Sequence, residues 1–255
     1  MVSGQKFASG RKAAILAAFS GSLRYMRLLL SPQDTCSYLP DRQSASLFVD
    51  PHEPLDMRRY AALLNVGFRR SGRYVYRPHC EGCQACVPAR IPVARFKANR
   101  SQRRNLRNNS DVIGRPCRDR FGERKYEMYK AYQQRRHPGG SMALADRSEF
   151  ASFLAADWAA TGFCEFYDGE ESLGVCVYDR VENGLSAVYT YYSQTGEKRG
   201  LGKFAVLWLI DEARRLKLAY VYLGYWISQC DKMSYKAEFQ PLEVLTQGAW
   251  RDLSG

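Results

Sequence analysis

Residues 172–227 read SLGVCVYDRVENGLSAVYTYYSQTGEKRGLGKFAVLWLIDEARRLKLAYVYLGYWI, and this stretch specifies the central layer of the protein. Two runs rich in β-branched and aromatic residues flank Asn183-Gly184, a pair that tolerates the positive φ angles of a type I′ turn, so they predict a β-hairpin. A turn with Gly200 and Gly202 follows, and then an apolar helix and a strand. This order predicts a layer of mixed helix and strand with a mostly buried helix.

The rest of the chain extends this layer and adds a second region before it. Further predicted elements are a helix at 58–67, a hairpin at 68–78, a helix at 122–136, a helix capped by Ser148 and a strand at 163–168. The fold class is therefore α+β. We expect a disordered N-terminal extension at 1–22, a loop-rich, Cys-containing N-terminal region at 23–112, and an α/β C-terminal domain at 113–255.

The charge balance indicates a polyanionic partner. The 255 residues include 38 Lys and Arg against 26 Asp and Glu, a formal net charge of +12. Phosphates attract such a surplus, so nucleic acid is the expected partner, although basic charge also serves solubility alone. We expect no membrane span, because no apolar run of about 18 residues is present. The eight cysteines are spread through a large chain, which favours reduced thiols and a cytoplasmic location.

A basic stripe lies in the segment RSQRRNLR. Arg100, Arg103, Arg104 and Arg107 follow the spacing i, i+3, i+4, i+7, which places them on one side of a helix. Like charges at these spacings repel, so an anionic partner is the natural reason for keeping them, and Lys97 extends the basic run. We predict that this surface binds RNA phosphates. The alternative is a solvated face without a partner.

The glycine turn KRGLGKF is a second candidate site. Gly200 and Gly202 let the backbone approach a ligand closely, and the helix that follows presents unpaired N–H groups that attract an anion. Arg199 adds positive charge there. Acyl-CoA acyltransferases hold a pyrophosphate on a similar turn. The alternative is an ordinary tight turn.

The segment after the last predicted strand alternates aromatic residues and lysines. Tyr225, Lys232, Tyr235 and Lys236 fall within LGYWISQCDKMSYKAEF. Such a mixture suits a nucleotide end, whose base stacks and whose phosphates pair with cations. Lys232 and Lys236 are four residues apart, so we expect them on one side of a helix. The alternative is a strand end followed by surface lysines.

Three cysteines, Cys80, Cys83 and Cys86, stand at two-residue gaps. This spacing lets thiolates converge on one metal ion or cluster, and a closed site then needs a further ligand, which Cys36 or His79 would supply. We predict either an iron–sulfur cluster or a zinc ion at these residues, or free thiols that line a pocket or pack in a core.

The blocks CSYLP, HCEGCQACVPARIPV, RSQRRN, AVYTYYS…KRGLG and LGYWI…KMSYKAEFQPLE occur in this order between about residues 23 and 245. Together they resemble the aminoacyl-tRNA–protein transferase family, and its bacterial branch most of all. The resemblance implies transfer of leucine from leucyl-tRNA to the α-amino group of proteins with N-terminal Asp or Glu, which creates a degradation signal, an N-degron. It also implies an N-acetyltransferase-like fold for residues 113–255.

The implied reaction is aminolysis of an activated ester, which requires no cofactor, so a metal at the cysteines would be structural or regulatory. For this chemistry we predict Tyr191 or Tyr225 near the reacting centre as the catalytic residue. The expected substrate-binding residues are Arg77, Arg90, Arg199, Gly200, Gly202, Lys232, Tyr235 and Lys236. Among these, the cations would pair with the acidic side chain of the acceptor. The expected tRNA-binding residues are Lys97, Arg100, Arg103, Arg104 and Arg107.

Three other functions stay open. An arginyl-tRNA-dependent transferase of the same family would use the same site. An acyl-CoA N-acyltransferase would share the glycine turn and its helix but would leave the basic stripe unexplained. A metal-stabilised RNA-binding module would account for the charge and the cysteines but not for the pattern of residues 172–227.

Overall fold

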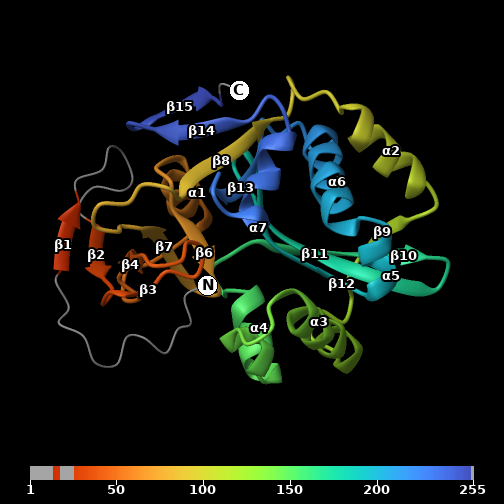
Figure 1. The fold of residues 1–255 in the computed structure, drawn as a ribbon, viewed down its shortest axis with the longest axis horizontal. Coiled ribbons are helices and arrows are strands. Elements are labelled where there is room, and N and C mark those ends of the chain that lie inside the picture. The colour runs from red at the N-terminus through yellow and green to blue at the C-terminus, as the bar shows by residue number, and fades with distance from the viewer. Residues whose placement is uncertain (1–13, 18–25, 254–255) are drawn as a thin grey trace.

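A computed structural model of the protein describes residues 14–17 and 26–253, and Figure 1 shows how helices and strands are mixed in it. The α+β class is confirmed at this level. Within these residues, no helix is long and apolar enough to span a membrane. Most of the extension predicted at 1–22 lies outside the described residues. Its described piece forms β1 (Ala14–Ala17), which pairs with β2 (Met26–Leu30).

The larger of the two main sheets has eight strands in the order β15-β14-β8-β13-β12-β11-β10-β9 within the described residues. Its strands are β8 (Val87–Pro92), β9 (Ile113–Pro116), β10 (Thr161–Asp168), β11 (Glu171–Val181), β12 (Gly184–Tyr192), β13 (Tyr220–Trp226), β14 (Glu243–Thr246) and β15 (Ala249–Asp252). The predicted hairpin is confirmed as β11 and β12, which pair antiparallel from Val181↔Gly184 outward.

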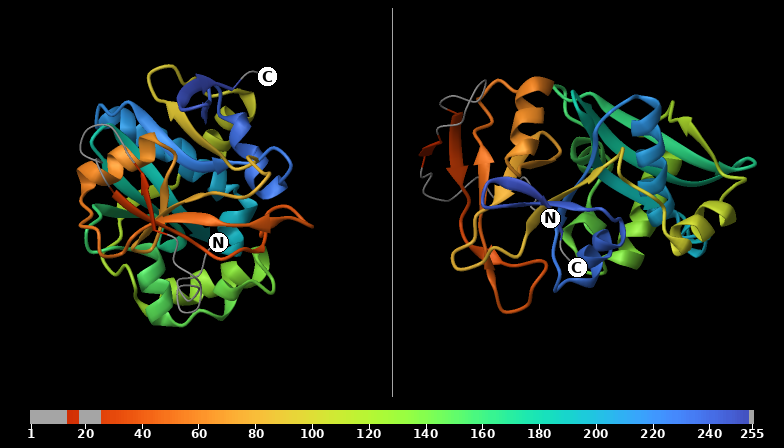
Figure 2. Two further views of the ribbon diagram at one scale, coloured as in Figure 1. Left: turned by 90° about the vertical axis from the view of Figure 1, so that its left-hand side faces the viewer. Right: turned by 90° about the horizontal axis from the view of Figure 1, so that it is seen from above.

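The smaller sheet has the strand order β1-β2-β5-β7-β6. It lies on the left side of Figure 1 and on the left side of the right-hand view in Figure 2. Its other strands are β5 (Ser46–Val49), β6 (Arg69–Ser71) and β7 (Tyr74–Pro78), and a separate ribbon pairs β3 (Asp34–Thr35) with β4 (Gln43–Ser44). The hairpin predicted at 68–78 is confirmed as β6 and β7.

Helices cover both faces of the larger sheet. The helices of the described residues are α1 (Met57–Asn65), α2 (Arg100–Asn108), α3 (Glu123–Arg136), α4 (Arg147–Leu154), α5 (Gln194–Lys198), α6 (Leu201–Arg215) and α7 (Asp231–Ser234), with 3-10 helices η3 (Ser141–Leu144) and η4 (Tyr235–Glu238). Helix α6 packs on one face and α3 and α4 on the other (Figure 1). Neighbouring residues of β10 follow this alternation: Phe166 contacts Phe204 of α6, whereas Glu165 pairs with Lys125 of α3.

The only parallel ladder recorded within the larger sheet joins β12 to β13 over a short distance in the described residues. It runs from Gly184↔Tyr220 to Ser186↔Tyr222 and then stops. The carboxyl halves of both strands therefore continue without pairing to each other. A register shift between β13 and β8 falls at Tyr222 and Gly224, so β13 also bends at this point.

Three predictions differ from the structure. Helix α4 is capped by Asp146, not Ser148, because Asp146 forms a capping box with Glu149. Lys232 and Lys236 do not share one helix, since α7 ends at Ser234 and a 3-10 turn follows. The short helix α5, capped by Ser193, occupies part of the predicted turn.

The division into 23–112 and 113–255 stays a prediction. The strand β8 (Val87–Pro92) comes from the N-terminal side of that boundary, yet it lies inside the larger sheet between β13 and β14. The sheets therefore share chain across the predicted boundary.

Candidate functional site

The glycine turn opens α6 as predicted. Gly200 is the residue before the helix and has φ +69°, the left-handed region that favours glycine. A Cβ on Gly200 would lie 2.8 Å from the Nδ2 atom of Asn105. That amide donates to the Arg199 and Gly200 carbonyls, both at 3.2 Å, and Asn109 donates to the Arg199 carbonyl at 3.0 Å. Helix α2 is thereby fastened to the turn.

Arg199 has several partners in the turn region. Its Nη1 atom lies 2.6 Å from Asp168, its Nη2 atom pairs with Asp111, and its Nε donates to Asn109 at 3.2 Å. The hydrogen bond from Arg199 lowers the pKa of the Asp111 carboxyl. These contacts give the Arg199 side chain a positioning role for the turn. Gly202, the second residue of α6, faces Tyr192, and a Cβ there would meet that ring at 3.4 Å.

The predicted basic helix is confirmed as α2. A capping box between Asn99 and Gln102 starts it, and Gln102 is buried against the Glu238 carbonyl at 3.0 Å. The five predicted tRNA-binding residues, Lys97, Arg100, Arg103, Arg104 and Arg107, are all exposed. None of these five has an acidic partner among residues 26–253. The surface is therefore open to an anionic ligand.

Neither candidate catalytic tyrosine is exposed. Tyr191 is 0% exposed and packs edge-on against Tyr129 at 5.6 Å and Phe150 at 6.0 Å. Its hydroxyl is buried without a hydrogen-bond partner in the described part of the chain, and burial raises its pKa well above the ordinary value. The catalytic role of Tyr191 stays a prediction.

Tyr225 is fixed by backbone contacts. Its hydroxyl is within hydrogen-bond reach of the Gly67 carbonyl at 2.9 Å and the Tyr76 carbonyl at 3.2 Å, and the side chain is 2% exposed. The Tyr225 carbonyl in turn accepts from the Lys236 ammonium. Tyr225 thus places Lys236 through its backbone, while its own catalytic role stays a prediction.

The two lysines of the aromatic segment differ in environment. Lys236 is 5% exposed, and burial together with the charge of Arg69 lowers its pKa to about 7. Lys232 is exposed and lies near His137, whose pKa is lowered by burial and then by the charge of Lys232. Tyr235, between them, is 38% exposed. The structure brings Lys236 close to Arg69, a residue that the sequence analysis did not select.

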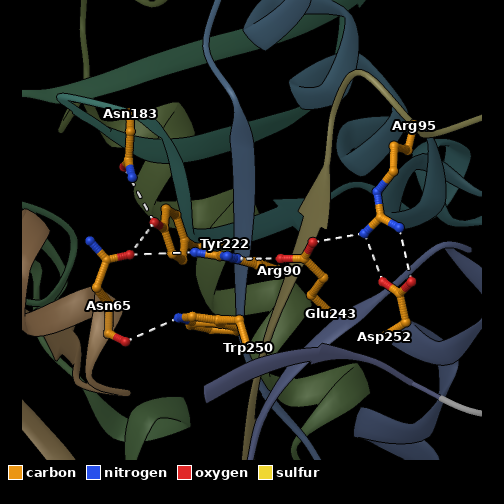
Figure 3. Close-up of polar contacts among 8 residues, drawn as sticks. All are labelled: Asn65, Arg90, Arg95, Asn183, Tyr222, Glu243, Trp250 and Asp252. Carbon is orange, nitrogen blue, oxygen red and sulfur yellow. Dashed lines mark hydrogen bonds and ion pairs between the residues drawn. The ribbon is translucent and has the colours of Figure 1, made fainter. Parts of the chain in front are cut away.

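The other predicted cations lie elsewhere in the contact network. Arg77 stacks over the Phe68 ring at 5.1 Å. Arg90 is sandwiched between the rings of Tyr220 at 3.7 Å and Trp250 at 4.2 Å. Its Nε atom lies 2.7 Å from Glu243 (Figure 3). The Arg90 guanidinium is therefore engaged by the protein itself, and β14 is held to β8 through it.

The cysteines of the N-terminal region gather in one place. The pKa of Cys86 is raised to about 12 by burial and by the neighbouring thiols of Cys80, Cys36, Cys83 and Cys230. Among the described residues, however, no three His, Cys, Asp or Glu side chains converge as ligands of one metal ion. As placed, the thiols do not form the ligand set of a metal ion. A metal or cluster here stays a prediction.

Individual thiols in this group have protein partners. The Cys83 sulfur accepts from Arg42 at 3.3 Å, and the pKa of Cys83 is lowered by a backbone hydrogen bond from Ala85 and by Arg42. Cys80 reaches the Ala45 carbonyl at 3.5 Å. Each of the eight cysteines is a free thiol.

Comparison with known proteins identifies the family. The model described as "Arginine-tRNA-protein transferase, N terminus" matches residues 34–104, and the one described as "Arginine-tRNA-protein transferase, C terminus" matches residues 124–246. The chain belongs to the aminoacyl-tRNA–protein transferase family. Membership makes the protein a transferase enzyme, with an aminoacyl-tRNA and a protein as substrates.

Relatives named aspartate/glutamate leucyltransferase resemble the chain over nearly its whole length. The protein of Pseudomonas fluorescens (strain SBW25) is 46% identical over 232 residues, which are 91% of this chain and 99% of the relative. That of Pseudomonas putida (strain W619) is 47% identical with the same coverage. A solved C-terminal domain (DUF2156) of a putative lysylphosphatidylglycerol synthetase from Agrobacterium fabrum shares 10% identity, covers 73% of this chain and 64% of its own, and has a TM-score of 0.45, which supports no inference.

Proposed function

We propose that the protein transfers leucine from leucyl-tRNA to the α-amino group of proteins that begin with Asp or Glu. The observation that carries this proposal is the near-complete alignment, at 46% and 47% identity, with relatives named for that activity. The product would carry an N-terminal leucine and serve as a degradation signal, as the resemblance to the bacterial branch implies. A reaction that consumes charged tRNA also supports a cytoplasmic location.

We propose an N-acetyltransferase-like fold for the catalytic part. The order β9, α3, α4, β10, β11, β12, α6, β13 supports it, together with the glycine turn that starts α6. The parallel ladder between β12 and β13 stops at Ser186↔Tyr222, so the carboxyl halves of the two strands are not paired with each other, and the reacting groups would lie beside them. Tyr225, Trp226 and Tyr191 belong to these halves.

The donor would approach from the side of α2. The four exposed arginines of α2 and Lys97, three residues before the helix, suit the phosphates of tRNA, and Asn105 and Asn109 couple this helix to the turn at Gly200. The N–H groups at the start of α6 would then face an anionic part of the donor end. Because α2 is fixed to the turn, tRNA binding on the helix and ester placement at the turn are parts of one site.

The chemistry needs no redox partner or metal. The acceptor nitrogen attacks the ester carbonyl carbon, a C–N bond forms, and the bond to the ribose oxygen breaks. The ribose oxygen gains a proton and the amine loses one, so the transfer balances. Because the ester is already activated, alignment of the two reactants supplies most of the acceleration, and intramolecular alignment is worth about 7–11 kcal/mol in favourable cases.

The test is a transfer assay with purified protein, labelled leucyl-tRNA or arginyl-tRNA, and peptides beginning with Asp, Glu, Lys or Ala. Leucine on the Asp and Glu peptides alone is the expected result. Arginine transfer would keep the family and overturn the proposed donor. Acylation by acetyl-CoA without tRNA, with no transfer from either tRNA, would favour an acyl-CoA N-acyltransferase instead.

A further inference from the structure

Arg69 reaches from the smaller sheet to the bend in β13. It lies on β6, and its guanidinium carbon is 5.9 Å from the centre of the Tyr225 ring. A Cβ on Gly224 would lie 2.7 Å from the Nη1 atom of Arg69 and 3.2 Å from its guanidinium carbon. Gly224 has φ +71°. The missing side chain at Gly224 therefore makes the room that the Arg69 guanidinium occupies.

The charge of Arg69 is not matched by the protein around it. Among residues 14–17 and 26–253, no hydrogen bond or ion pair of the Arg69 side chain is found. Its neighbour Arg70 is the contrast, since Arg70 is fully buried and holds Asp179, Thr161 and two carbonyl groups. A guanidinium offers several N–H donors in a fixed plane, and those of Arg69 are therefore available to a ligand with acceptor oxygens.

A second cation lies beside the first. Lys236 is 5% exposed, its ammonium donates to the Tyr225 carbonyl, and Met233 Sδ is its other contact at 3.7 Å in the described chain. Burial and the positive charge of Arg69 together lower the pKa of Lys236, so the two side chains interact electrostatically. Tyrosines and thiols surround the pair: Tyr38, Tyr76, Tyr225, Tyr235, Cys86 and Cys230.

The position of this pair matches the reacting region. Gly224 is two residues beyond Tyr222, where the ladder between β12 and β13 stops. An anion held by Arg69 would therefore lie beside the point where these two strands stop pairing. The group that needs a cation there is the side-chain carboxylate of the acceptor. This carboxylate belongs to the same N-terminal residue as the attacking α-amino group, so the two groups lie only a side chain's length apart. Planar guanidinium and planar carboxylate pair through two parallel hydrogen bonds.

We propose that Arg69 is the specificity-determining residue for the acceptor: its guanidinium pairs with the side-chain carboxylate of the N-terminal Asp or Glu, and the Lys236 ammonium is the second positive charge of this pocket. This inference rests on the proposed function, since it names the residue that reads the acceptor. Among the cations predicted from the sequence, Arg77, Arg90, Arg199, Lys232 and Lys236, it keeps Lys236 and adds Arg69. Arg90 and Arg199 have acidic protein partners.

The experiment compares Arg69→Gln with wild type on peptides that begin with Glu, Gln, Asp or Asn. Wild type should strongly prefer the acids. Arg69→Gln should lower kcat/KM for Glu and Asp peptides by about 30-fold to 1,000-fold, mainly through KM, because a buried partner of the carboxylate is lost. The Gln and Asn peptides should change little. Leucyl-tRNA binding should be unchanged, and Arg73→Gln, an exposed arginine in the next turn, is the matched control.

Failure of the proposal and failure of the proposed function give different results. If wild type transfers no leucine to any peptide, the function is wrong, and the Arg69 site is then tested by calorimetric binding of Glu and Gln peptides without tRNA. Loss of the Glu preference in Arg69→Gln supports the proposal in either assay. An undiminished preference in a folded Arg69→Gln protein overturns it. If that variant does not fold, Arg69→Lys is measured instead: about a tenfold loss is expected because lysine cannot pair at two points, and an unchanged preference overturns the proposal.

Discussion

Arg70 and Asp179 form a two-point ion pair with both side chains 0% exposed, at 2.5 Å between Nε and Oδ2 and 2.7 Å between Nη2 and Oδ1. The pair joins β6 of the smaller sheet to β11 of the larger one. Arg70 also donates to the Leu154 carbonyl at 3.0 Å, so α4 is held at the same point. One guanidinium therefore fastens three elements together.

Removing one partner of this pair should destabilise the fold strongly. Asp179→Ala leaves the Arg70 charge buried without its counter-ion, and such changes cost about 3–5 kcal/mol. Urea denaturation measures the free energy of unfolding. Arg147→Ala, which breaks the exposed pair with Glu123 at 3.1 Å, is the control and should cost less than about 1 kcal/mol. Equal losses for both variants would contradict the importance of the buried pair.

Lys236 should make stability depend on pH. The unfolded chain holds this proton up to the ordinary pKa of 10.5, whereas the folded chain holds it only up to about 7. Between these values the unfolded state binds more protons, so the free energy of unfolding should rise as pH increases from about 7 to 10.5. Below pH 7 the ammonium is charged in both states and the cost of burying it persists.

The Lys236→Met variant removes this titration. Its free energy of unfolding should exceed that of wild type at pH 6, by at most about 5 kcal/mol, and the gap should close towards pH 10. Chemical denaturation at several pH values measures both curves. Lys232→Met, an exposed lysine, should leave the wild-type slope in place. Parallel curves for wild type and Lys236→Met would show that the folded protein does not hold Lys236 with a lowered pKa.

The basic surface of α2 should control tRNA affinity through salt. Replacing Arg103 and Arg107 by Gln should weaken the binding of leucyl-tRNA whatever its nucleotide sequence. The slope of log binding constant against log salt concentration should fall in magnitude by about one for each phosphate that the variant no longer neutralises. Filter binding at several salt concentrations measures this slope. Arg215→Gln, at the far end of α6 and paired with Glu212 at 2.7 Å, is the control. An unchanged slope in the α2 variant would remove this helix from the tRNA surface.

The turn at Gly200 should not tolerate a side chain. Gly200→Ala places a Cβ against the Asn105 amide and forces alanine to φ +69°, at a cost of about 1–2 kcal/mol from the backbone alone. Transfer should fall further than stability does, because the link between α2 and the turn is disturbed. Gly248→Ala is the matched control: its φ is +76°, with nothing within 4 Å of the added Cβ. Equal transfer rates in both variants would leave the turn without a role.

Thiol reactivity should follow the local environments. The lowered pKa of Cys83 gives more thiolate at neutral pH, whereas burial raises the pKa of Cys86 to about 12 and acts in the same direction on Cys176. Brief iodoacetamide treatment followed by peptide mass spectrometry should find Cys83 alkylated well before Cys86. The reverse order would mean that the contacts of Cys83 with Arg42 and Ala85 do not persist in solution.

Local patterns account for the parts of the fold that were predictable. Asn183-Gly184 specifies its turn through φ angles alone, and the Gly200 turn and α6 follow directly in the chain. The place of β8 was not predictable, since its partners β13 and β14 lie more than a hundred residues further along. The cap of α4 was predictable from spacing, because Asp146 stands three residues before Glu149, as a capping box requires, and Ser148 does not.

The site divides in the same way. The exposed stripe of α2 follows from helical spacing, which is a property of neighbouring residues. The burial of Lys236 and the engagement of Arg90 by Glu243 and two aromatic rings depend on distant segments, which composition and spacing do not reveal. The segment FRRSG predicts only part of a strand and does not single out Arg69. Adjacent arginines in a strand point to opposite faces, and that alternation is the one signal the sequence offers.

Neighbouring residues of strand β6 therefore have different roles: Arg70 stabilises the fold and Arg69 is the proposed acceptor-binding residue. Arg70 holds Asp179 and joins the two sheets, while the Arg69 guanidinium lies against Gly224. Because the side-chain period of a strand is two, a slip of β6 by a single residue would turn both guanidiniums to the opposite faces. Stability of the fold and specificity for the acceptor thus depend on the same strand register of β6. A change that shifts this register would disturb both arginines at once.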